Sequence, residues 1–377
     1  MANRTLKSQS SLEERIIGNT EFYKTKVAIP HSQSRFYEFV VKKRYQNLEY
    51  ISEGSQGAVV FAKDVLTGDN VAIKRIELTP NYLKFNYREV EFLSRVEHEN
   101  IITVKDIFTP VMRQSEMSYF YIVMEFMEGT LSMIETELGL EHIKKIVGEM
   151  IYAVHYLHEN NIMHRDLKPG NIGIDDESNV KLLDFGLANF DSNNKKTKKI
   201  VTRSYRAPEL WLGLDYDKKI DMWSVGCILA ELCVGKSIFK VDEKDLNDDR
   251  HLNKICEILG CPDFASVYPK LSEDSLKRLS TFPQYQIAEL DNILSTNQLC
   301  KEGGENLKNL LKGLLEFDPH KRLSAEEALN HPFFDGYFKD QIELNRECPI
   351  HTFTCPENSY SELEQMLWEK IQENQQN

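Results

Sequence analysis

The stretch HRDLKPGNIGIDDESNVKLLDFG, residues 164–186, brings three potential ligand side chains, Asp166, Asn171 and Asp184, into one short span. The residues 180–183 directly before Asp184 are mostly apolar and predict a buried strand that ends at this carboxylate. Magnesium ions prefer one or two carboxylates together with phosphate oxygens. Transfer of a phosphoryl group also requires a side chain that accepts a hydrogen bond from the acceptor hydroxyl. The stretch therefore contains the groups that phosphoryl transfer needs.

The order of these residues resembles that of protein kinases, in which a His-Arg-Asp segment precedes an Asp-Phe-Gly segment. The resemblance implies ATP and Mg²⁺ as cofactors, with Asp166 as the catalytic base. It also implies that Lys168 steadies the transferring phosphate and that Asn171 and Asp184 hold the metal. A solvated loop before a strand is the alternative interpretation, and it leaves the joint match of these residues unexplained.

A glycine-containing segment, SEGSQGAV at residues 52–59, lies between two strand patterns. A glycine-rich hairpin lets backbone N–H groups approach phosphates, although a turn of this kind between two strands often has no further role. The segment departs from the kinase pattern because Ser52 replaces the first glycine. The two inner glycines, Gly54 and Gly57, are present.

The strand pattern VAIK at residues 71–74 follows this segment. Strand alternation places Ala72 and Lys74 on the same face. By the resemblance, Ala72 covers the adenine and Lys74 reaches the α and β phosphates. A lysine directed into a protein interior needs an anion, and the resemblance implies Glu89 on the following helix as its partner. Outside this pattern, Lys74 would be an ordinary solvated lysine.

The segment YIVMEFM at residues 121–127 resembles the hinge between kinase lobes, and it is equally compatible with an ordinary buried strand. The resemblance implies that the Glu125 carbonyl and the Met127 amide meet the adenine edge, with Met124 at the back of the pocket. Gly173 replaces the Val or Leu that related kinases place beneath the adenine, which predicts a looser pocket floor. The full nucleotide-binding set implied by the resemblance is Ile51, Ser52, Glu53, Gly54, Ser55, Gln56, Gly57, Ala58, Val59, Ala72, Lys74, Glu89, Met124, Glu125 and Met127.

The composition limits the other classes of function. A formal net charge of -13 opposes binding to nucleic acid or to an anionic membrane, because phosphates repel it. The seven cysteines lack CxxC or Cys/His spacing, so free thiols and a location in the cytosol or nucleus are expected. No apolar run approaches the roughly 20 residues of a membrane span, and the N-terminal residues lack a hydrophobic signal core.

A chain of 377 residues is longer than one compact core usually supports. Short alternating segments dominate residues 45–76, a helical pattern follows at residues 82–96, and helices dominate beyond residue 127. We therefore expect an α+β, two-lobed protein kinase fold with a small β-rich N-lobe and a large helical C-lobe. The expected boundaries are an N-terminal lead-in or edge strands at 1–44, a kinase domain at 45–334 with lobes at 45–127 and 128–334, and a C-terminal extension at 335–377.

The last stretch of the chain places Leu363, Met366, Leu367 and Ile371 at helical spacing. Such a stripe is typical of a helix that buries one face. We therefore expect the C-terminal extension to contain a helix that docks onto the body of the protein.

The segment VTRSYRAPE at residues 201–209 resembles the kinase group that includes MAP kinases and cyclin-dependent kinases. The segments KRYQNL at 43–48 and HENII at 98–102, with the hinge and the C-terminal helix, look most like the c-Jun N-terminal kinase branch of MAP kinases. The resemblance implies a serine/threonine kinase for Ser-Pro and Thr-Pro sites in other proteins, because proline has no N–H to leave unsatisfied. It implies an upstream MAP kinase kinase and docking-motif partners, and we expect a monomer.

The resemblance also implies structural roles for residues outside the catalytic set. Glu209 is expected to form a buried ion pair with Arg322, and Asp221 is expected to brace the catalytic loop. Thr202 is expected to orient Asp166 and Lys168.

The activation lip departs from the MAP kinase pattern. Thr197 and Lys199 occupy the positions of the family's Thr-x-Tyr motif, so dual phosphorylation is excluded. A phosphate on Thr197 would carry a charge of about -2, which Arg88 and Arg165 are expected to bind. Asn189 replaces the third arginine that binds this phosphate in the family. The lip is either switched by one phosphate or is a basic loop without a switching role.

Two other functions remain open. A pseudokinase or scaffold is favoured by Ser52, Gly173, Asn189 and the missing tyrosine. A cyclin-dependent kinase would require a bound cyclin, but residues 86–90 lack the helix sequence that such kinases carry. An active enzyme is favoured by the complete catalytic set, which is Lys74, Glu89, Asp166, Asn171 and Asp184.

Overall fold

The computed structural model describes most of the chain. The described residues are 15–16, 21–30, 35–54, 57–190, 202–241, 248–283, 285, 289–335, 337–347 and 359–376. Among them, no helix is both long enough and apolar enough to cross a membrane.

The described residues fall into two compact units. The first lies within Met1–Val96, Ile102–Met127 and Phe353–Asn377, and the second within Glu97–Ile101 and Glu128–Thr352. The first unit is rich in strands and the second is mainly helical, so the expected α+β class is confirmed.

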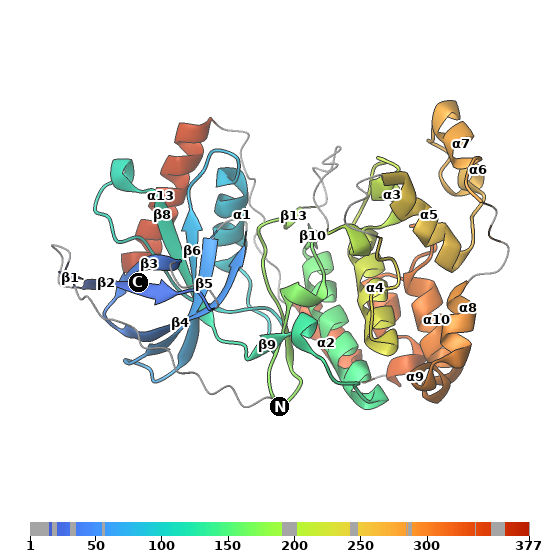
Figure 1. Cartoon of the computed structure of the whole chain (residues 1–377), viewed down its shortest axis with the longest axis horizontal. Coiled ribbons are helices and arrows are strands. Elements are labelled where there is room, and N and C mark those ends of the chain that lie inside the picture. The colour runs from blue at the N-terminus through green and yellow to red at the C-terminus, as the bar shows by residue number, and fades with distance from the viewer. Residues whose placement is uncertain are drawn as a thin grey trace. The chain divides into compact units, whose positions relative to one another are not determined.

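The first unit is built on a five-stranded antiparallel sheet with the order β4-β5-β6-β8-β7 (Figure 1). Its strands are β4 (Tyr45–Gly54), β5 (Gly57–Asp64), β6 (Asn70–Glu77), β7 (Val104–Phe108) and β8 (Tyr119–Glu125). Burial alternates along β5 and over the first part of β6, so that Val71 and Ile73 enter the core while Ala72 and Lys74 share the other face. The predicted placement of Ala72 and Lys74 is thereby confirmed.

The helix α1 (Leu83–Leu93) follows β6. The sequence predicts that this helix extends to Val96, and this is wrong. The helix ends at Leu93, and Ser94 donates its backbone N–H to the Val90 carbonyl as the C-cap. Val96 therefore lies outside the helix.

The N-terminal region forms an edge sheet, which is one of the two expected alternatives. Strands β1 (Arg15–Ile16), β2 (Phe22–Ala28) and β3 (Phe36–Lys42) pair in the order β1-β2-β3. Phe22, Phe39 and Val41 join Tyr45 and Phe108 in one hydrophobic core cluster. The edge sheet is thus packed onto the main sheet of its own unit.

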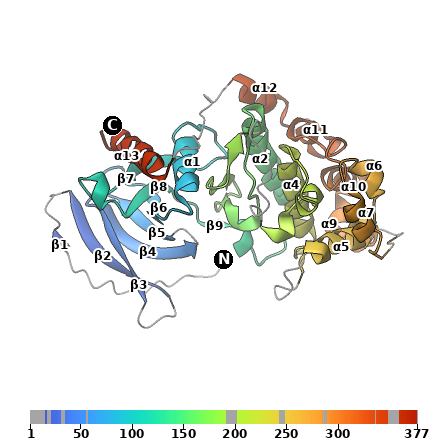
Figure 2. The same ribbon diagram turned by 90° about the horizontal axis from the view of Figure 1, so that it is seen from above.

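The last helix, α13 (Tyr360–Gln376), packs against α1 and β7 (Figures 1 and 2). Leu363, Leu367 and Ile371 are buried, and Met366 is half-buried. The predicted apolar stripe therefore docks this helix onto the first unit. The Lys370 ammonium lies 3.8 Å from the Glu91 carboxylate on α1.

The second unit surrounds two long helices, α2 (Leu140–Glu159) and α4 (Lys219–Val234), which pack against each other. The buried residues of α4 include Trp223, Val225 and Ile228, so this helix lies inside the unit. The sequence also predicts helices at 141–160, 219–234, 305–315 and 324–330. They correspond to α2, α4, α10 (Gly304–Leu314) and α11 (Ala325–Leu329) within one residue at each end.

The other elements of this unit are short. The strands are β9 (Gly129–Thr130), β10 (Ile162–Met163), β11 (Ile172–Ile174), β12 (Val180–Leu182) and β13 (Asn189–Phe190). The other helices are α3 (Pro208–Trp211), α5 (Asp248–Leu259), α6 (Phe264–Val267), α7 (Glu273–Leu279), α8 (Glu289–Thr296), α9 (Gln298–Glu302), α10 (Gly304–Leu314), α11 (Ala325–Leu329) and α12 (Lys339–Glu347).

Candidate active site

The carboxylate of Asp166 is the centre of a hydrogen-bond cluster in the second unit. Oδ2 accepts from Lys168 Nζ at 2.7 Å and from Asn171 Nδ2 at 2.9 Å. Oδ1 accepts from the Thr202 hydroxyl at 2.9 Å and from the Thr202 backbone N–H at 3.2 Å. Donors on both oxygens fix the orientation of the carboxylate. The arrangement joins three of the residues that the sequence places together, with Thr202 contributed by a later segment.

The backbone that carries Asp166 is held from α4. Asp221 is 1% exposed and accepts from the backbone N–H groups of His164 at 2.9 Å and Arg165 at 2.8 Å. Its Oδ2 lies 3.0 Å from His158 Nε2. Burial acts to raise the pKa of Asp221, but His158 and the backbone donors outweigh it and hold this pKa below its usual value. The predicted bracing role of Asp221 is confirmed.

A hairpin of β11 and β12 connects Asn171 to Asp184. Ile172 pairs with Leu182, and the Leu183 N–H donates to the Asn171 carbonyl at 2.9 Å. Asp184 then follows as an exposed residue with a positive φ of 59°. The buried strand that the sequence predicts before Asp184 is therefore present.

The donor set of Asn171 and Asp184 fits a hard divalent cation. Asn171 Nδ2 donates to both the carbonyl and the carboxylate of Asp166, at 2.8 and 2.9 Å. Because Nδ2 is used in this way, Oδ1 is the end of the amide that is offered to a cation. An amide oxygen and an exposed carboxylate are ligand types that suit Mg²⁺.

Lys74 and Glu89 form an ion pair in the first unit. Lys74 Nζ on β6 lies 2.5 Å from Glu89 Oε1 on α1. Glu89 is 1% exposed, so its carboxylate is shielded from water and the pair is screened little by salt. The pairing expected from the resemblance is thus present, and it fixes the ammonium group of Lys74 relative to the sheet.

The glycine-containing segment is the hairpin of β4 and β5, in which Gly54 pairs with Gly57. Ser55 and Gln56, at its tip, lie outside the described residues. Ile51, Ser52 and Glu53 are exposed, whereas the Ala58 side chain is completely buried in the core cluster. Only the backbone of Ala58 can therefore face a ligand.

Gly57 is the position in this hairpin where a side chain cannot fit. Its φ is +151°, and an added Cβ would lie 1.8 Å from the Arg75 carbonyl oxygen. A Cβ on Gly54 would meet nothing within 4 Å. We expect Gly57→Ala to lower the free energy of unfolding by about 1–3 kcal/mol, and Gly54→Ala to change it by less than about 0.5 kcal/mol. Denaturant unfolding of both variants measures the difference, and equal stabilities would contradict this assignment.

Of the other nucleotide-set residues, Val59 is half-buried on β5, and Met124, Glu125 and Met127 lie on or just after β8. Met124 and Glu125 are half-buried, and Glu125 Oε1 accepts from the Thr103 N–H at 2.7 Å. Met127 follows two residues after Glu125 and ends the second segment of the first unit. This hydrogen bond involves the side chain of Glu125 and not its backbone carbonyl. The role of that carbonyl in nucleotide binding therefore stays a prediction.

The structure describes two of the positions at which the sequence departs from the kinase pattern, Gly173 and Asn189. Gly173 is buried in β11 between Thr130 and Lys181, and Asn189 is buried in β13 opposite Met163. Thr197 and Lys199 lie outside the described residues. The number of phosphates that switch the lip therefore stays a prediction.

Comparison with known proteins agrees with this geometry. Residues 45–334 match the protein kinase domain family. The chain is 35% identical to the stress-activated protein kinase jnk-1 of Caenorhabditis elegans, with 83% of this chain and 69% of that protein covered. It is 36% identical to mitogen-activated protein kinase 13 of Bos taurus, with 82% of each covered, and 36% identical to GLH-binding kinase 1 of C. elegans, with 81% of each covered. The chain is a serine/threonine protein kinase of the MAP kinase family.

The kinase also contains the buried ion pair expected from its sequence. Arg322 donates to both carboxylate oxygens of Glu209, at 2.7 and 3.0 Å. Both residues are at most 1% exposed. The pair ties α3, which follows the Thr202 segment, to the segment before α11.

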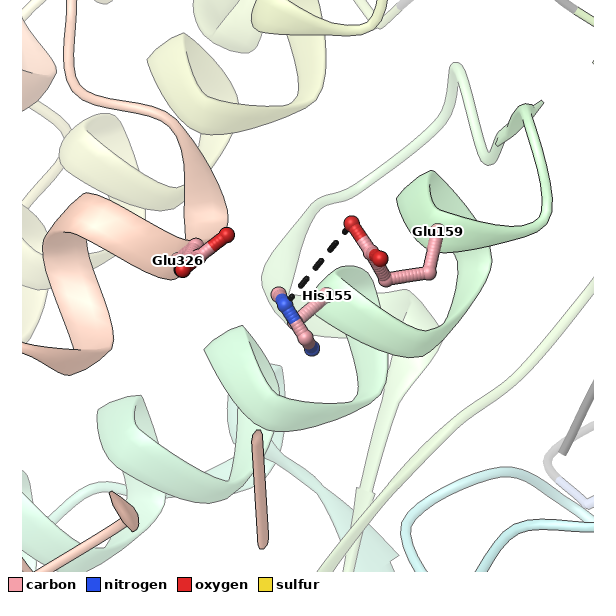
Figure 3. A group of neighbouring side chains, drawn as sticks. All are labelled: His155, Glu159 and Glu326. Carbon is pink, nitrogen blue, oxygen red and sulfur yellow. Dashed lines mark ion pairs between the residues drawn. The ribbon is translucent and has the colours of Figure 1, made fainter. Parts of the chain in front are cut away.

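A second cluster in the kinase contains possible metal ligands, His155 and Glu159 of α2 and Glu326 of α11 (Figure 3). Asn345 Nδ2 donates to the Tyr152 carbonyl and lies 3.0 Å from His155 Nδ1. Because Nδ2 is only a donor, Nδ1 must accept, and the proton of the neutral ring lies on Nε2, 3.9 Å from Glu159. A metal would need the lone pair of this nitrogen, so the hydrogen bonding opposes a metal site here.

Two residues, Arg165 and Tyr37, make contacts that are absent from the sequence prediction. Arg165 has a positive φ of 66° and donates to the Leu187 carbonyl and the Tyr216 hydroxyl. The Tyr37 hydroxyl contacts Glu53 next to the glycine turn. None of these contacts has a sequence signal, because each partner lies on a separate segment at no fixed spacing.

Proposed function

We propose that this kinase transfers the γ-phosphate of ATP to serine or threonine residues that precede proline in other proteins, within a stress-activated MAP kinase pathway. The observation that carries the proposal is the Asp166 carboxylate, which is held by Thr202, Lys168 and Asn171. A carboxylate fixed in this way can accept the proton of a substrate hydroxyl as it attacks phosphorus.

In this proposal Lys168 has two roles. Its Nζ donates a hydrogen bond of 2.7 Å to Asp166 Oδ2 and so orients the carboxylate. Its positive charge stabilises the negative oxygens of the transferring phosphoryl group. Thr202 holds the other oxygen of Asp166, so that one lone pair of the carboxylate faces the substrate in a fixed direction.

ATP and Mg²⁺ are the proposed cofactors. Asn171 and Asp184 would hold the metal, which neutralises phosphate charge when bound. Lys74, positioned by Glu89 at 2.5 Å, would bind the α and β phosphates. The nucleotide-binding residues are those implied by the sequence resemblance, with Ala58 acting through its backbone.

The proposed partners are protein substrates with Ser-Pro or Thr-Pro sites, an upstream MAP kinase kinase acting on Thr197, and proteins with docking motifs. A location in the cytosol or nucleus is supported by the five free cysteines among the described residues, because disulfides are rare in those compartments. The kinase is proposed to act as a monomer.

A scaffold without transferase activity is the second candidate, favoured by Gly173 in β11 and Asn189 in β13. Labelled ATP and a Ser-Pro peptide distinguish the two functions, with Asp184→Ala as the blank. We expect transfer by the wild type and at most residual transfer by the variant. Equal signals from both proteins would exclude the enzymatic function.

A further inference from the structure

The glycine turn of the kinase is weakly supported by its own sheet. The register of β4 and β5 shifts where Ile51 is left between the pairs Tyr50–Val60 and Ser52–Val59. A bulge of this kind interrupts the ladder and bends the strand. Residues 51–54 are all exposed. Apolar burial therefore contributes little to the position of this end of β4.

A side chain of the edge sheet reaches this end of β4. The Tyr37 hydroxyl on β3 donates a hydrogen bond of 2.8 Å to Glu53 Oε2. The ring of Tyr37 packs against the core cluster, so the hydroxyl projects from a supported side chain. The hydrogen bond to Glu53, together with partial burial, raises the pKa of Tyr37. Tyr37 thus remains a neutral donor well above neutral pH.

We propose that Tyr37 is a positioning residue for the phosphate-binding turn, acting through its hydrogen bond to Glu53. The inference rests on the proposed role of residues 51–59 in nucleotide binding. Glu53 pairs with Ala58, and the next pair is Gly54 with Gly57. The hydrogen bond from Tyr37 therefore tethers β4 at Glu53, one residue pair before the turn. This point lies between the bulge at Ile51 and the turn.

The energetic reason is preorganisation. A turn that moves freely must lose backbone conformations when its N–H groups bind phosphate, and a tether that limits this freedom beforehand increases affinity. Ser52 stands where related kinases carry the first glycine of this segment, and a residue with a Cβ has fewer accessible backbone conformations than glycine. The hydrogen bond from Tyr37 restricts the adjacent residue in the same way.

Tyr37→Phe is the direct test, because it removes one oxygen atom and keeps the ring. We expect the Kd for magnesium-ATP, measured by titration calorimetry, to rise about 3- to 10-fold. Amide hydrogen exchange at residues 57–59 should become faster, while the KM for the peptide and the midpoint of thermal unfolding stay unchanged. An unchanged Kd with unchanged exchange would overturn the inference.

Variants of Glu53 test whether Tyr37 acts through this residue. Glu53→Gln keeps an acceptor oxygen and is expected to retain most of the affinity, whereas Glu53→Ala should match Tyr37→Phe. Combining Tyr37→Phe with Glu53→Ala should add no further loss, and additive effects would show that Tyr37 acts by another route.

Tyr50→Phe is the matched control. Tyr50 packs against the same core cluster as Tyr37, and among the described residues its hydroxyl has no hydrogen bond to Glu53 or another acceptor. We expect unchanged ATP affinity. The Kd and exchange measurements need no catalysis, so they decide this inference even if transfer to the peptide, and with it the proposed function, fails.

Discussion

Replacing Asp166 by asparagine is expected to lower kcat by about 10²–10⁴-fold, the range in which a positioned general base contributes to a rate. The amide cannot take the proton of the substrate hydroxyl. It also replaces one acceptor oxygen by a donor in a cluster where Lys168, Asn171 and Thr202 all donate. Because the lost interaction belongs to the transition state, KM should change much less than kcat.

Steady-state kinetics with a Ser-Pro peptide measures this effect, and thermal unfolding shows whether the fold is retained. Asp176→Asn is the matched control, since Asp176 is an exposed residue in the turn between β11 and β12. It removes the same charge from the same segment and should leave kcat unchanged. An Asp166→Asn variant that retains more than a tenth of the wild-type kcat would exclude Asp166 as the base.

The sequence predicts that Asp166, Lys168 and Asn171 lie together because the geometry of this cluster is largely local. Asp166, Lys168 and Asn171 lie within one short loop, so residue spacing alone brings them together. The strand alternation that places Lys74 beside Ala72 is local in the same sense. The partner of Lys74 required the family resemblance, since nothing in the spacing between β6 and α1 determines their contact.

The edge sheet shows why other parts could not be predicted. Residues 39–41 of β3 are buried consecutively, because this part of the strand is covered on both faces. A strand of this kind lacks the alternating pattern that identifies a half-buried strand. Sequence reasoning therefore left a loose lead-in and an edge hairpin as alternatives, and it could not place Tyr37 next to Glu53.

Replacing Arg322 by alanine is expected to lower the free energy of unfolding by about 3–5 kcal/mol. The change leaves the Glu209 carboxylate buried without its two guanidinium donors. It also removes donors from the backbone carbonyls of Glu316 and Lys219, at 2.9 and 3.0 Å. Denaturant unfolding measures the loss, and Lys321→Ala, at a neighbouring side chain that is 74% exposed, should change stability by less than about 0.5 kcal/mol.

The combined variant Glu209→Gln with Arg322→Met separates the cost of the unpaired Glu209 carboxylate from the cost of the lost guanidinium donors. Most of the cost of breaking a buried pair arises from the charge that remains. The combined variant contains neither charge, so it should be more stable than Arg322→Ala. It should still be less stable than the wild type, because the carbonyls of Glu316 and Lys219 have lost their donors. Equal stability of Arg322→Ala and the combined variant would show that the lost donors to the backbone carbonyls, which are missing from both variants, and not the unpaired carboxylate, dominate the loss.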